Sequence, residues 1–327
     1  RGAQYHLAHD YDLMMALEDV ADFGLLANYT RRWDEKIRPF PKNASWVANF
    51  ARGYDLAILN IDQQCTNLDL NKSILPLHMK QAIRGIDPDV PIIWINHGTP
   101  VYPETFNDGN FSNNYVSEKL RTAIIDIVGD DLMVVNSVQA KEEWKKGHVI
   151  IHGMGLDEWK VSEDKEPRVA TSIYLAGIGE KYYNRSFFTA VRDDLLEEKG
   201  VRLQWINAPG CFNATDIQDY KNFLSKTLVY FNPTFASPMP RSRTEAMLSG
   251  CAIVTTPQHG GSEYIKDGYN GVIVPHNNVS VASNVIALLL KERYNEAKEM
   301  GKNARKTAEE HFNRERYKND WVSLLEM

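Results

Sequence analysis

Short aliphatic and β-branched runs alternate with amphipathic stretches along the whole chain. The runs predict strands at 24–29, 56–61, 91–96, 132–136, 149–152, 172–176, 202–206, 228–232, 251–255 and 271–274. The amphipathic stretches predict helices at 7–20, 77–85, 116–127, 185–199, 217–226, 242–250, 281–312 and 314–327. Several of the strands are apolar throughout, as is typical of strands covered on both faces of a parallel sheet. The alternation of strand and helix therefore predicts a doubly wound α/β architecture.

The pattern divides into two halves. Residues 156–168 are charged, contain Pro167 and lack an apolar period, so they predict a surface linker. We expect an N-terminal domain at 1–157, a C-terminal domain at 158–312, and a final helix at 313–327 that packs back toward the N-terminal domain. The first predicted element is a helix, whereas an α/β half normally opens with a strand, so a first strand is expected to be missing here.

The composition is that of an ordinary globular protein. The 327 residues are 43% hydrophobic and 24% charged, which rules out disorder and coiled coil. No apolar run approaches the roughly 20 residues of a membrane span. The net charge of −6 disfavours a nucleic-acid partner. The three cysteines are far apart, which favours a reducing, cytoplasmic setting and argues against zinc.

One basic group bears on membrane contact. It predicts a solvated helix face or, as the sharper alternative, peripheral contact with an anionic membrane. Its members are Lys141, Lys145, Lys146 and His148.

Residues 238–275 hold the densest signal. Ser242 and Glu245 have the spacing of a capping box, with serine at the N-cap and the acid three residues later. Gly250 is placed to end that helix before the next strand. A glycine-rich turn at 257–262 opens a short helix, whose free N–H groups would form an anion site. Residues 267–271 predict a turn before another strand.

This segment resembles the nucleotide-sugar-binding half of the retaining GT-B-fold glycosyltransferases, the large family that includes sucrose and mannosyl synthases. The spaced matches are Glu245, Ala246, Met247, Gly250, Val254, Gly260, Gly261, Glu263, Ile265, Asp267, Gly268, Asn270, Gly271 and Val274. Residues 95–98, 134–137 and 150–157 resemble, more weakly, the family's histidine at a strand end, its strand before serine, and its hinge.

The resemblance implies two Rossmann-like doubly wound domains that face each other across a cleft. It implies a retaining transferase that uses a nucleotide-diphosphate sugar and needs neither a metal nor another cofactor. His97 and Glu245 are the candidate catalytic residues. The candidate donor-binding residues are Gly2, Lys181, Arg185, Ser237, Arg241, Arg243, Thr244, Glu245, Gly260 and Gly261. Tyr5, His6 and His9 in the first helix are candidates for acceptor binding.

Two departures from the family pattern affect the donor site. Ser237 stands where the family has the first of two acids that grip the donor sugar. Lys181 and Arg185 are out of register with the family's Arg and Lys, while Arg241 and Arg243 are additional cations that can contact the diphosphate. Structural alternatives stay open: Glu245 as a capping acid, the 260–261 glycines as a turn, and His97 as a structural histidine.

The expected activity is sugar transfer to an acceptor that is a glycan, a lipid or a small molecule. Ser237 and the missing Arg/Lys pair motivate one alternative, a weak or inactive GT-B-derived module that binds a sugar or nucleotide. A glycosyltransferase that modifies nucleic acid is a further alternative, which the acidic balance disfavours. The sequence leaves the oligomeric state open.

Overall fold

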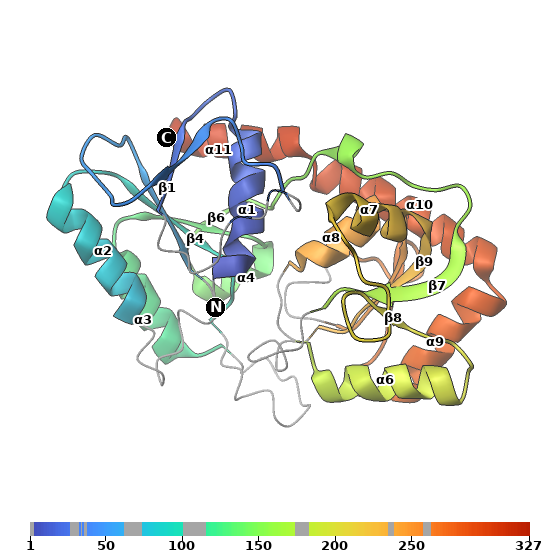
Figure 1. The fold of residues 1–327 in the computed structure, drawn as a ribbon. Helices are drawn as coiled ribbons and strands as arrows, with labels where there is room; N and C mark the ends of the chain where they lie inside the picture. Colours follow the sequence, from blue (N-terminus) through green and yellow to red (C-terminus); the bar gives the residue numbers. More distant parts are fainter. Residues whose placement is uncertain are drawn as a thin grey trace. The chain divides into compact units, whose positions relative to one another are not determined.

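The computed structural model describes residues 3–26, 33, 35, 38–61, 74–100, 116–173, 183–234, 239–257 and 263–327. They divide into two compact units (Figure 1). Unit 1 holds the described residues up to 100, residues 116–154 and Arg314–Met327, and unit 2 holds Gly155–Asn313 apart from the gaps. None of the described helices is long and apolar enough to cross a membrane.

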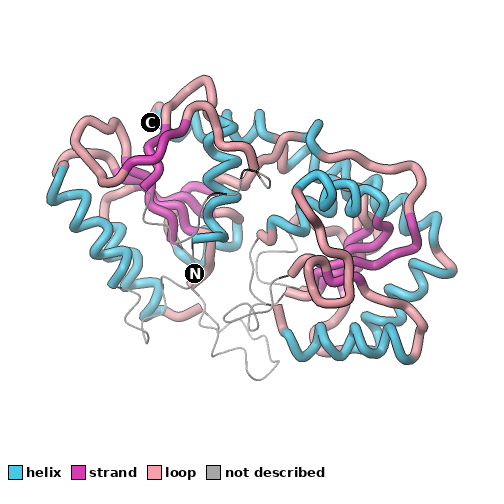
Figure 2. The backbone as a smooth tube through the Cα atoms, viewed as in Figure 1, coloured by secondary structure: helices cyan, strands magenta, loops and turns pink. Residues whose placement is uncertain are grey.

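Unit 1 is built on a parallel sheet in the order β3-β4-β5-β6. Its strands are β3 (Ala57–Ile61), β4 (Ile92–Asn96), β5 (Leu132–Val135) and β6 (His148–Val149). Three helices connect them, α2 (Ile74–Ile86), α3 (Glu118–Val128) and α4 (Val138–Trp144). In Figure 2 the strands of this sheet run in the interior with these helices beside them. Four neighbouring strands thus end at the same edge of one sheet.

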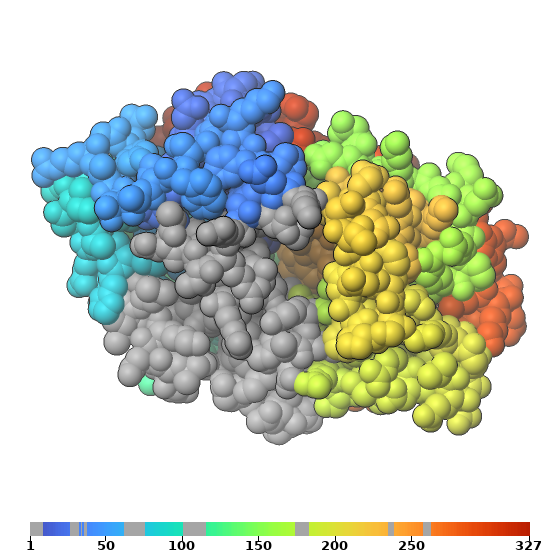
Figure 3. Space-filling model, in the orientation of Figure 1, coloured from blue at the N-terminus to red at the C-terminus, as the bar shows by residue number. Residues whose placement is uncertain are grey.

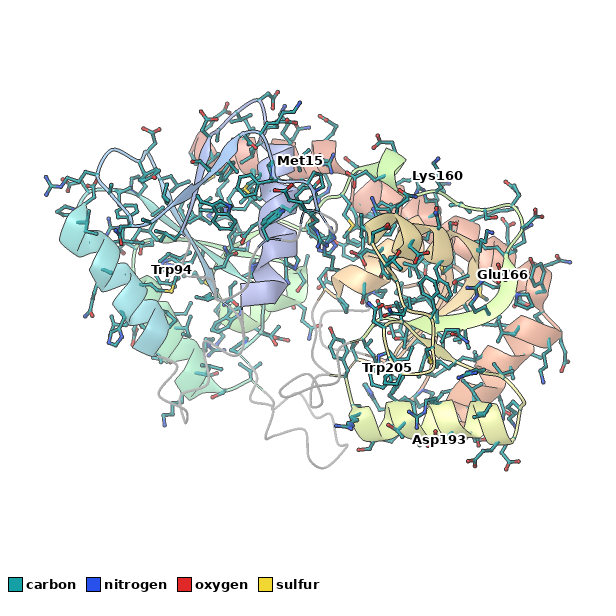
Figure 4. The ribbon with its side chains drawn as sticks, viewed as in Figure 1. Met15, Trp94, Lys160, Glu166, Asp193 and Trp205 are labelled. Atoms are coloured by element: carbon teal, nitrogen blue, oxygen red, sulfur yellow. The ribbon has the colours of Figure 1, made fainter. Side chains whose placement is uncertain are left out.

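The two faces of this sheet bury different side chains. Trp94 on β4 is fully buried among Leu120, Ile124 and Trp144 of the connecting helices (Figure 4). The neighbouring Ile93 and Ile95 point to the opposite face, as strand geometry requires. There they pack on α1 (Ala3–Ala16) and α11 (Arg314–Leu325). The last helix is therefore part of the core of unit 1.

A second, two-stranded parallel sheet in unit 1 pairs β1 (Phe23–Leu26) with β2 (Ala44–Val47). An aromatic group beside it includes Trp33, Phe40 and Trp46, with Phe40 and Trp46 ring centroids 5.4 Å apart. The apolar pattern of the sequence predicted the first of these strands and missed the second. β2 is half-exposed, so it carries no continuous apolar run.

Unit 2 is a five-stranded parallel sheet in the order β11-β10-β9-β7-β8. Its strands are β7 (Glu166–Thr171), β8 (Gln204–Trp205), β9 (Thr227–Asn232), β10 (Ala252–Thr255) and β11 (Gly271–Ile273). The chain moves outward from β7 to β8 and then returns to the other side of β7 with β9. The order therefore reverses between β7 and β9, which is the switch point of a doubly wound sheet.

Helices cover both faces of the unit 2 sheet (Figure 1). α6 (Arg185–Glu197) and α9 (Val279–Lys291) pack on one face, with Phe188 and Ile286 in the main core. α7 (Ile217–Lys226) and α8 (Arg241–Leu248) belong to the other face, and α10 (Tyr294–His311) packs on α8 and β10. Gly301 on α10 is required there, because a Cβ would lie 2.2 Å from the carbonyl oxygen of Gly250.

The predicted linker at 156–168 and the strand predicted at 172–176 are wrong in part. A short 3-10 helix lies at Leu156–Glu158, and β7 already starts at Glu166, which is labelled in Figure 4. The first half of β7 is exposed and charged, with Glu166 paired to Arg168, while only its second half is buried. The apolar pattern of a sequence identifies only the buried residues of a strand, so the predicted strand began after the exposed first half of β7.

Two helix predictions are also corrected. The helix predicted at 281–312 is two helices, α9 and α10, because the chain turns at residues 292–293 to bring Leu289 and Met300 into the same core. The basic group near α4 does not share one helix face. α4 ends at Trp144, Lys146 donates to the carbonyl of Gly129, and His148 begins β6.

Candidate functional site

The carboxyl ends of the unit 1 strands carry a group of polar side chains. Asn60 lies near the end of β3, Asn96 ends β4, and His97 follows it directly. Asn136 follows β5, and its amide donates to the backbone carbonyl of His97 at 3.3 Å. Parallel strands meet at this edge, so the fold gathers residues that are up to 76 positions apart between Asn60 and Asn136.

His97 is held by a chain of two hydrogen bonds. Its Nε2 lies 2.8 Å from Oδ1 of Asn60, whose Nδ2 donates to Oδ1 of Asp10 at 2.9 Å. A carboxylate only accepts, so Asp10 fixes the amide with its oxygen toward His97. His97 then carries its proton on Nε2. The half-buried imidazole is thus oriented, as a group that positions a substrate needs to be.

Two further histidines stand beside His97. The ring centroid of His9 on α1 is 4.5 Å from that of His97 and 5.7 Å from that of the buried His152. The structure therefore brings His9 and His97, a predicted acceptor residue and a predicted catalytic residue, into contact. Sequence reasoning did not single out Asn60 or His152 as site residues.

In unit 2 the site lies at the switch point between β7 and β9. Open α/β sheets bind ligands outside the carboxyl ends of their strands at this place. Ser172 follows β7, and Asn232 ends β9. Asn232 is fully buried, and neither atom of its amide has a hydrogen-bond partner within the part of the chain that the structure describes.

Glu245 on α8 is the central acid of this edge. Its side chain is 10% exposed, and Oε1 accepts from Nη1 of Arg241 at 3.1 Å. Oε2 accepts from the hydroxyl of Tyr220 at 2.8 Å. Tyr220 in turn reaches Ser172, whose Oγ lies 3.2 Å from the Tyr220 hydroxyl. The structure thus connects Glu245 to the first strand of the unit.

Arg243 is a buried cation on the same helix. Its side chain has no exposed surface, and Nη2 donates to the sulfur of Met239 at 3.6 Å. Nε and Nη1 have no hydrogen-bond partner among the residues described. Burial lowers the pKa of Arg243 to about 10, and the charge of Glu263 opposes that shift. The guanidinium therefore stays charged at neutral pH, and two of its three nitrogens remain available to a ligand as far as the described residues show.

The predicted capping box is wrong. α8 begins at Arg241 with Pro240 at the N-cap, and no side chain caps it, so Ser242 lies inside the first turn. The ring of Pro240 fixes its φ near the helical value, so the chain enters α8 at this residue without a side-chain cap from Ser242. Glu245 therefore does not cap this helix, and the capping alternative for this residue is wrong. The helix ends at Leu248 with Ser249 as its C-cap, and Gly250 follows with a φ of +71°, so the glycine terminates the helix as predicted.

The other predicted donor and acceptor residues are placed as follows. Arg185 is the exposed first residue of α6, and Thr244 is fully buried on α8. Tyr5 and His6 lie in α1, where only the backbone is described. Gly2, Lys181, Ser237, Gly260 and Gly261 lie outside the described residues.

His276 fixes the chain next to the glycine-rich segment by donating from Nε2 to the carbonyl of Pro257. Burial lowers its pKa from 6.5 to about 4, although this hydrogen bond opposes the shift. The folded protein therefore keeps His276 neutral at pH values where the unfolded chain binds a proton. Its contribution to stability is complete above pH 6.5 and is lost as the pH falls from 6.5 toward 4.

We expect His276→Gln to flatten the fall in stability between pH 6.5 and 4. Urea unfolding at several pH values, compared with the wild type, measures that difference. The exposed His78→Gln is the control and should leave the pH profile unchanged. Parallel profiles for wild type and His276→Gln would contradict the assignment.

No group of three or more His, Cys, Asp or Glu side chains within the described ranges is arranged to hold a metal ion. The chemistry offered by the two strand edges is hydrogen bonding and charge: an acid that accepts, a buried arginine that donates, and an oriented imidazole.

Residues 212–307, which contain Tyr220, Arg243, Glu245 and His276, match the family model for glycosyl transferases group 1. The chain carries a group 1 glycosyl transferase domain. An uncharacterized glycosyltransferase of Methanocaldococcus jannaschii is 33% identical over 85 residues, which is 26% of this chain and 21% of that protein. The chain thus spans about a fifth of the length of this curated relative.

Several solved glycosyltransferases have a similar fold. HepE of Anabaena, solved with UDP and glucose, gives a TM-score of 0.69 at 15% identity over 100% of this chain and 96% of that one. A TarM mutant of S. aureus, solved with fondaparinux, α-GlcNAc-glycerol and UDP, gives a TM-score of 0.61 at 14% identity. That match covers 77% of this chain and 54% of TarM. Sucrose-phosphate synthase of Thermosynechococcus elongatus gives a TM-score of 0.60 at 15% identity. That match covers 84% of this chain and 73% of the synthase.

The chain spans about half the length of TarM. At these identities the likeness concerns the fold alone. It confirms the predicted class, α/β with two Rossmann-like units as in the GT-B glycosyltransferases, and the resemblance to that family.

Proposed function

We propose that the protein is a glycosyltransferase that moves a sugar from a nucleotide-diphosphate donor to an acceptor, with retention and without a metal. The observation that carries the proposal is the Glu245 carboxylate at the switch-point edge of the matched domain. It is almost buried, it has two fixed protein partners, and it has no capping role. A carboxylate in that place can accept both hydroxyls of a donor ribose.

Other residues of the two units would supply the remaining parts of the reaction. The departing diphosphate develops charge, which Arg241 and Arg243 of α8 would stabilise together with Lys181 and Arg185. His97 would position the sugar, since Asn60 and Asp10 fix its ring. His9 in contact with His97, and Tyr5 and His6 on the same helix, would meet the acceptor, a glycan, a lipid or a small molecule. In this proposal residues 1–157 form the domain that binds the acceptor, and residues 158–312 form the domain that binds the donor.

A second candidate function is a nucleotide-sugar-binding module without turnover. Ser237 favours it, because this short neutral side chain stands where the family has an acid for the donor sugar. For a working transferase the same substitution favours a donor that lacks a hydroxyl or carries an acid, such as a pentose, deoxysugar or uronic acid. A glutamate facing a missing hydroxyl would be left unpaired at a cost of about 1–3 kcal/mol.

A donor screen tests both candidates. We expect slow hydrolysis of at least one nucleotide sugar in the presence of EDTA, with the released sugar keeping the donor's anomeric configuration by NMR. Pentose, deoxysugar or uronic-acid donors should be used faster than UDP-glucose and GDP-mannose. Binding without hydrolysis would identify the binding module, and neither binding nor hydrolysis would contradict the proposal.

A further inference from the structure

A chain of hydroxyl groups ends on Glu245. The Tyr230 hydroxyl lies 2.7 Å from Oγ of Ser172, which lies 3.2 Å from the hydroxyl of Tyr220. Tyr220 is 2.8 Å from Oε2 of Glu245. The four residues come from β9, the end of β7, α7 and α8, so the chain exists only in the folded unit.

The direction of these hydrogen bonds is fixed at both ends. Glu245 is an acceptor, so Tyr220 must donate its only proton to Oε2. The oxygen of Tyr220 then accepts from Ser172. Ser172 has then used its only proton on Tyr220, so its Oγ accepts the proton of Tyr230, whose oxygen accepts from the backbone N–H of Ser172 at 2.9 Å. All three hydroxyls therefore donate toward Glu245.

Tyr220 itself is held in place and kept protonated. The ring of Trp159 packs edge-on against it, with centroids 6.2 Å apart and planes at 85°. Burial and the adjacent charge of Glu245 raise the pKa of Tyr220 well above 10. The phenol is thus a permanent donor to Glu245 over the physiological pH range.

The acceptor capacity that remains on Glu245 follows by counting. A carboxylate offers about four lone-pair directions, two on each oxygen. Arg241 takes one on Oε1, and Tyr220 takes one on Oε2. Among the described residues nothing else bonds to this carboxylate, so one further lone-pair direction remains on each of its two oxygens. Two hydroxyl groups on adjacent carbon atoms can therefore donate one hydrogen bond to each carboxylate oxygen, whereas a single hydroxyl group would use only one of the two oxygens.

We propose that Tyr220 is a positioning residue that fixes the carboxylate of Glu245 so that each oxygen accepts one ribose hydroxyl, and that the site thereby selects ribonucleoside over 2′-deoxyribonucleoside diphosphate sugars. The inference rests on the proposed function, because it assumes that Glu245 meets the ribose of the donor. Without Tyr220 the carboxylate can rotate, and Oε2 no longer has a fixed direction. The ribose 2′-hydroxyl then adds little binding free energy compared with the hydrogen atom that replaces it in the 2′-deoxy analogue.

The test compares Tyr220→Phe with wild type in binding one nucleoside diphosphate and its 2′-deoxy analogue. UDP, GDP and ADP are first screened by calorimetry, and the tightest is used. We expect wild type to prefer the ribonucleotide by about tenfold or more, which corresponds to one hydrogen bond to a charged group. Tyr220→Phe should weaken ribonucleotide binding by a similar factor and bring the preference close to one.

Two further variants test whether the change in preference is specific to the contact between Tyr220 and Glu245. Tyr294→Phe also removes a hydroxyl that bonds within unit 2, to the carbonyl of Lys165, and should leave the preference intact. Ser172→Ala removes the donor to Tyr220 but keeps the backbone N–H, so a smaller loss of preference is expected even if Tyr220→Phe is unstable.

The possible failures are distinct. If wild type binds none of the three nucleotides, the proposed function fails. If wild type discriminates and Tyr220→Phe keeps the same preference, or loses both affinities equally, the inference is overturned.

Discussion

Glu245→Ala is expected to weaken nucleoside diphosphate binding by about 1.5–3 kcal/mol, the range for hydrogen bonds to a charged group. This corresponds to roughly a 10- to 150-fold rise in Kd. The loss would include both proposed ribose contacts, and the substitution also removes the partner that holds Arg241 and Tyr220. Calorimetry with UDP and GDP measures it directly.

Glu299→Ala is the matched control, because its side chain is 62% exposed on α10 of the same unit. It should bind nucleotide as the wild type does. Since α8 has no side-chain cap to lose, Glu245→Ala should keep its helix, and circular dichroism verifies this. Unchanged nucleotide affinity in the folded variant would show that Glu245 does not meet the ribose.

The sequence predicted the two-unit α/β fold because burial leaves a strong local signal. The fully buried strands β4 and β9 were found within one residue of their ends. Strands with exposed or charged residues were not: β2 was missed, and β7 was placed six residues too late, at 172 instead of Glu166. Their stability comes from pairing with neighbours, which a local pattern does not record.

The candidate site was predictable only where one residue sits in a local motif. Glu245 and His97 could be proposed as site residues because each lies in a short segment that resembles a family motif, Glu245 in the 245–274 pattern and His97 after a strand. Tyr220 was not, since its partners Ser172 and Glu245 lie 48 and 25 positions away and meet it only at the switch point. Asp10 illustrates the same limit. Nothing in the sequence around Asp10 connects it with His97, whereas in the fold its buried carboxylate fixes Asn60 beside His97.

Arg243→Met is expected to change stability and binding in opposite directions. In the free protein the guanidinium is fully buried, and two of its nitrogens have no hydrogen-bond partner among the described residues. Burial of a charge without hydrogen-bond partners costs the folded state free energy, so an apolar side chain of similar length should be neutral or stabilising at this position. Met239 lies beside it and offers an apolar contact. The variant should therefore unfold at the same urea concentration as wild type or at a higher one.

Binding should suffer in the same variant. If the open donors of Arg243 meet an anionic oxygen of the donor, their loss removes one partner of a buried charge pair, at a cost of about 2–5 kcal/mol. That is roughly a 30- to 5,000-fold loss of affinity for the nucleotide sugar. Comparison of UDP-glucose with UDP-glucuronic acid then separates a phosphate from a sugar carboxylate as the anion. Equal losses indicate phosphate, and a larger loss for the acid indicates the carboxylate.

Arg192→Met is the control, because that arginine is 40% exposed on α6 of the same unit, and it should change neither quantity. The opposite result for Arg243→Met is equally informative. A destabilised variant with unchanged nucleotide binding would mean that Arg243 serves to neutralise Glu263, whose charge acts on it in the folded unit. A stabilised variant with lost binding would instead show that unit 2 keeps an unsatisfied cation for its substrate, a local cost in stability retained for function.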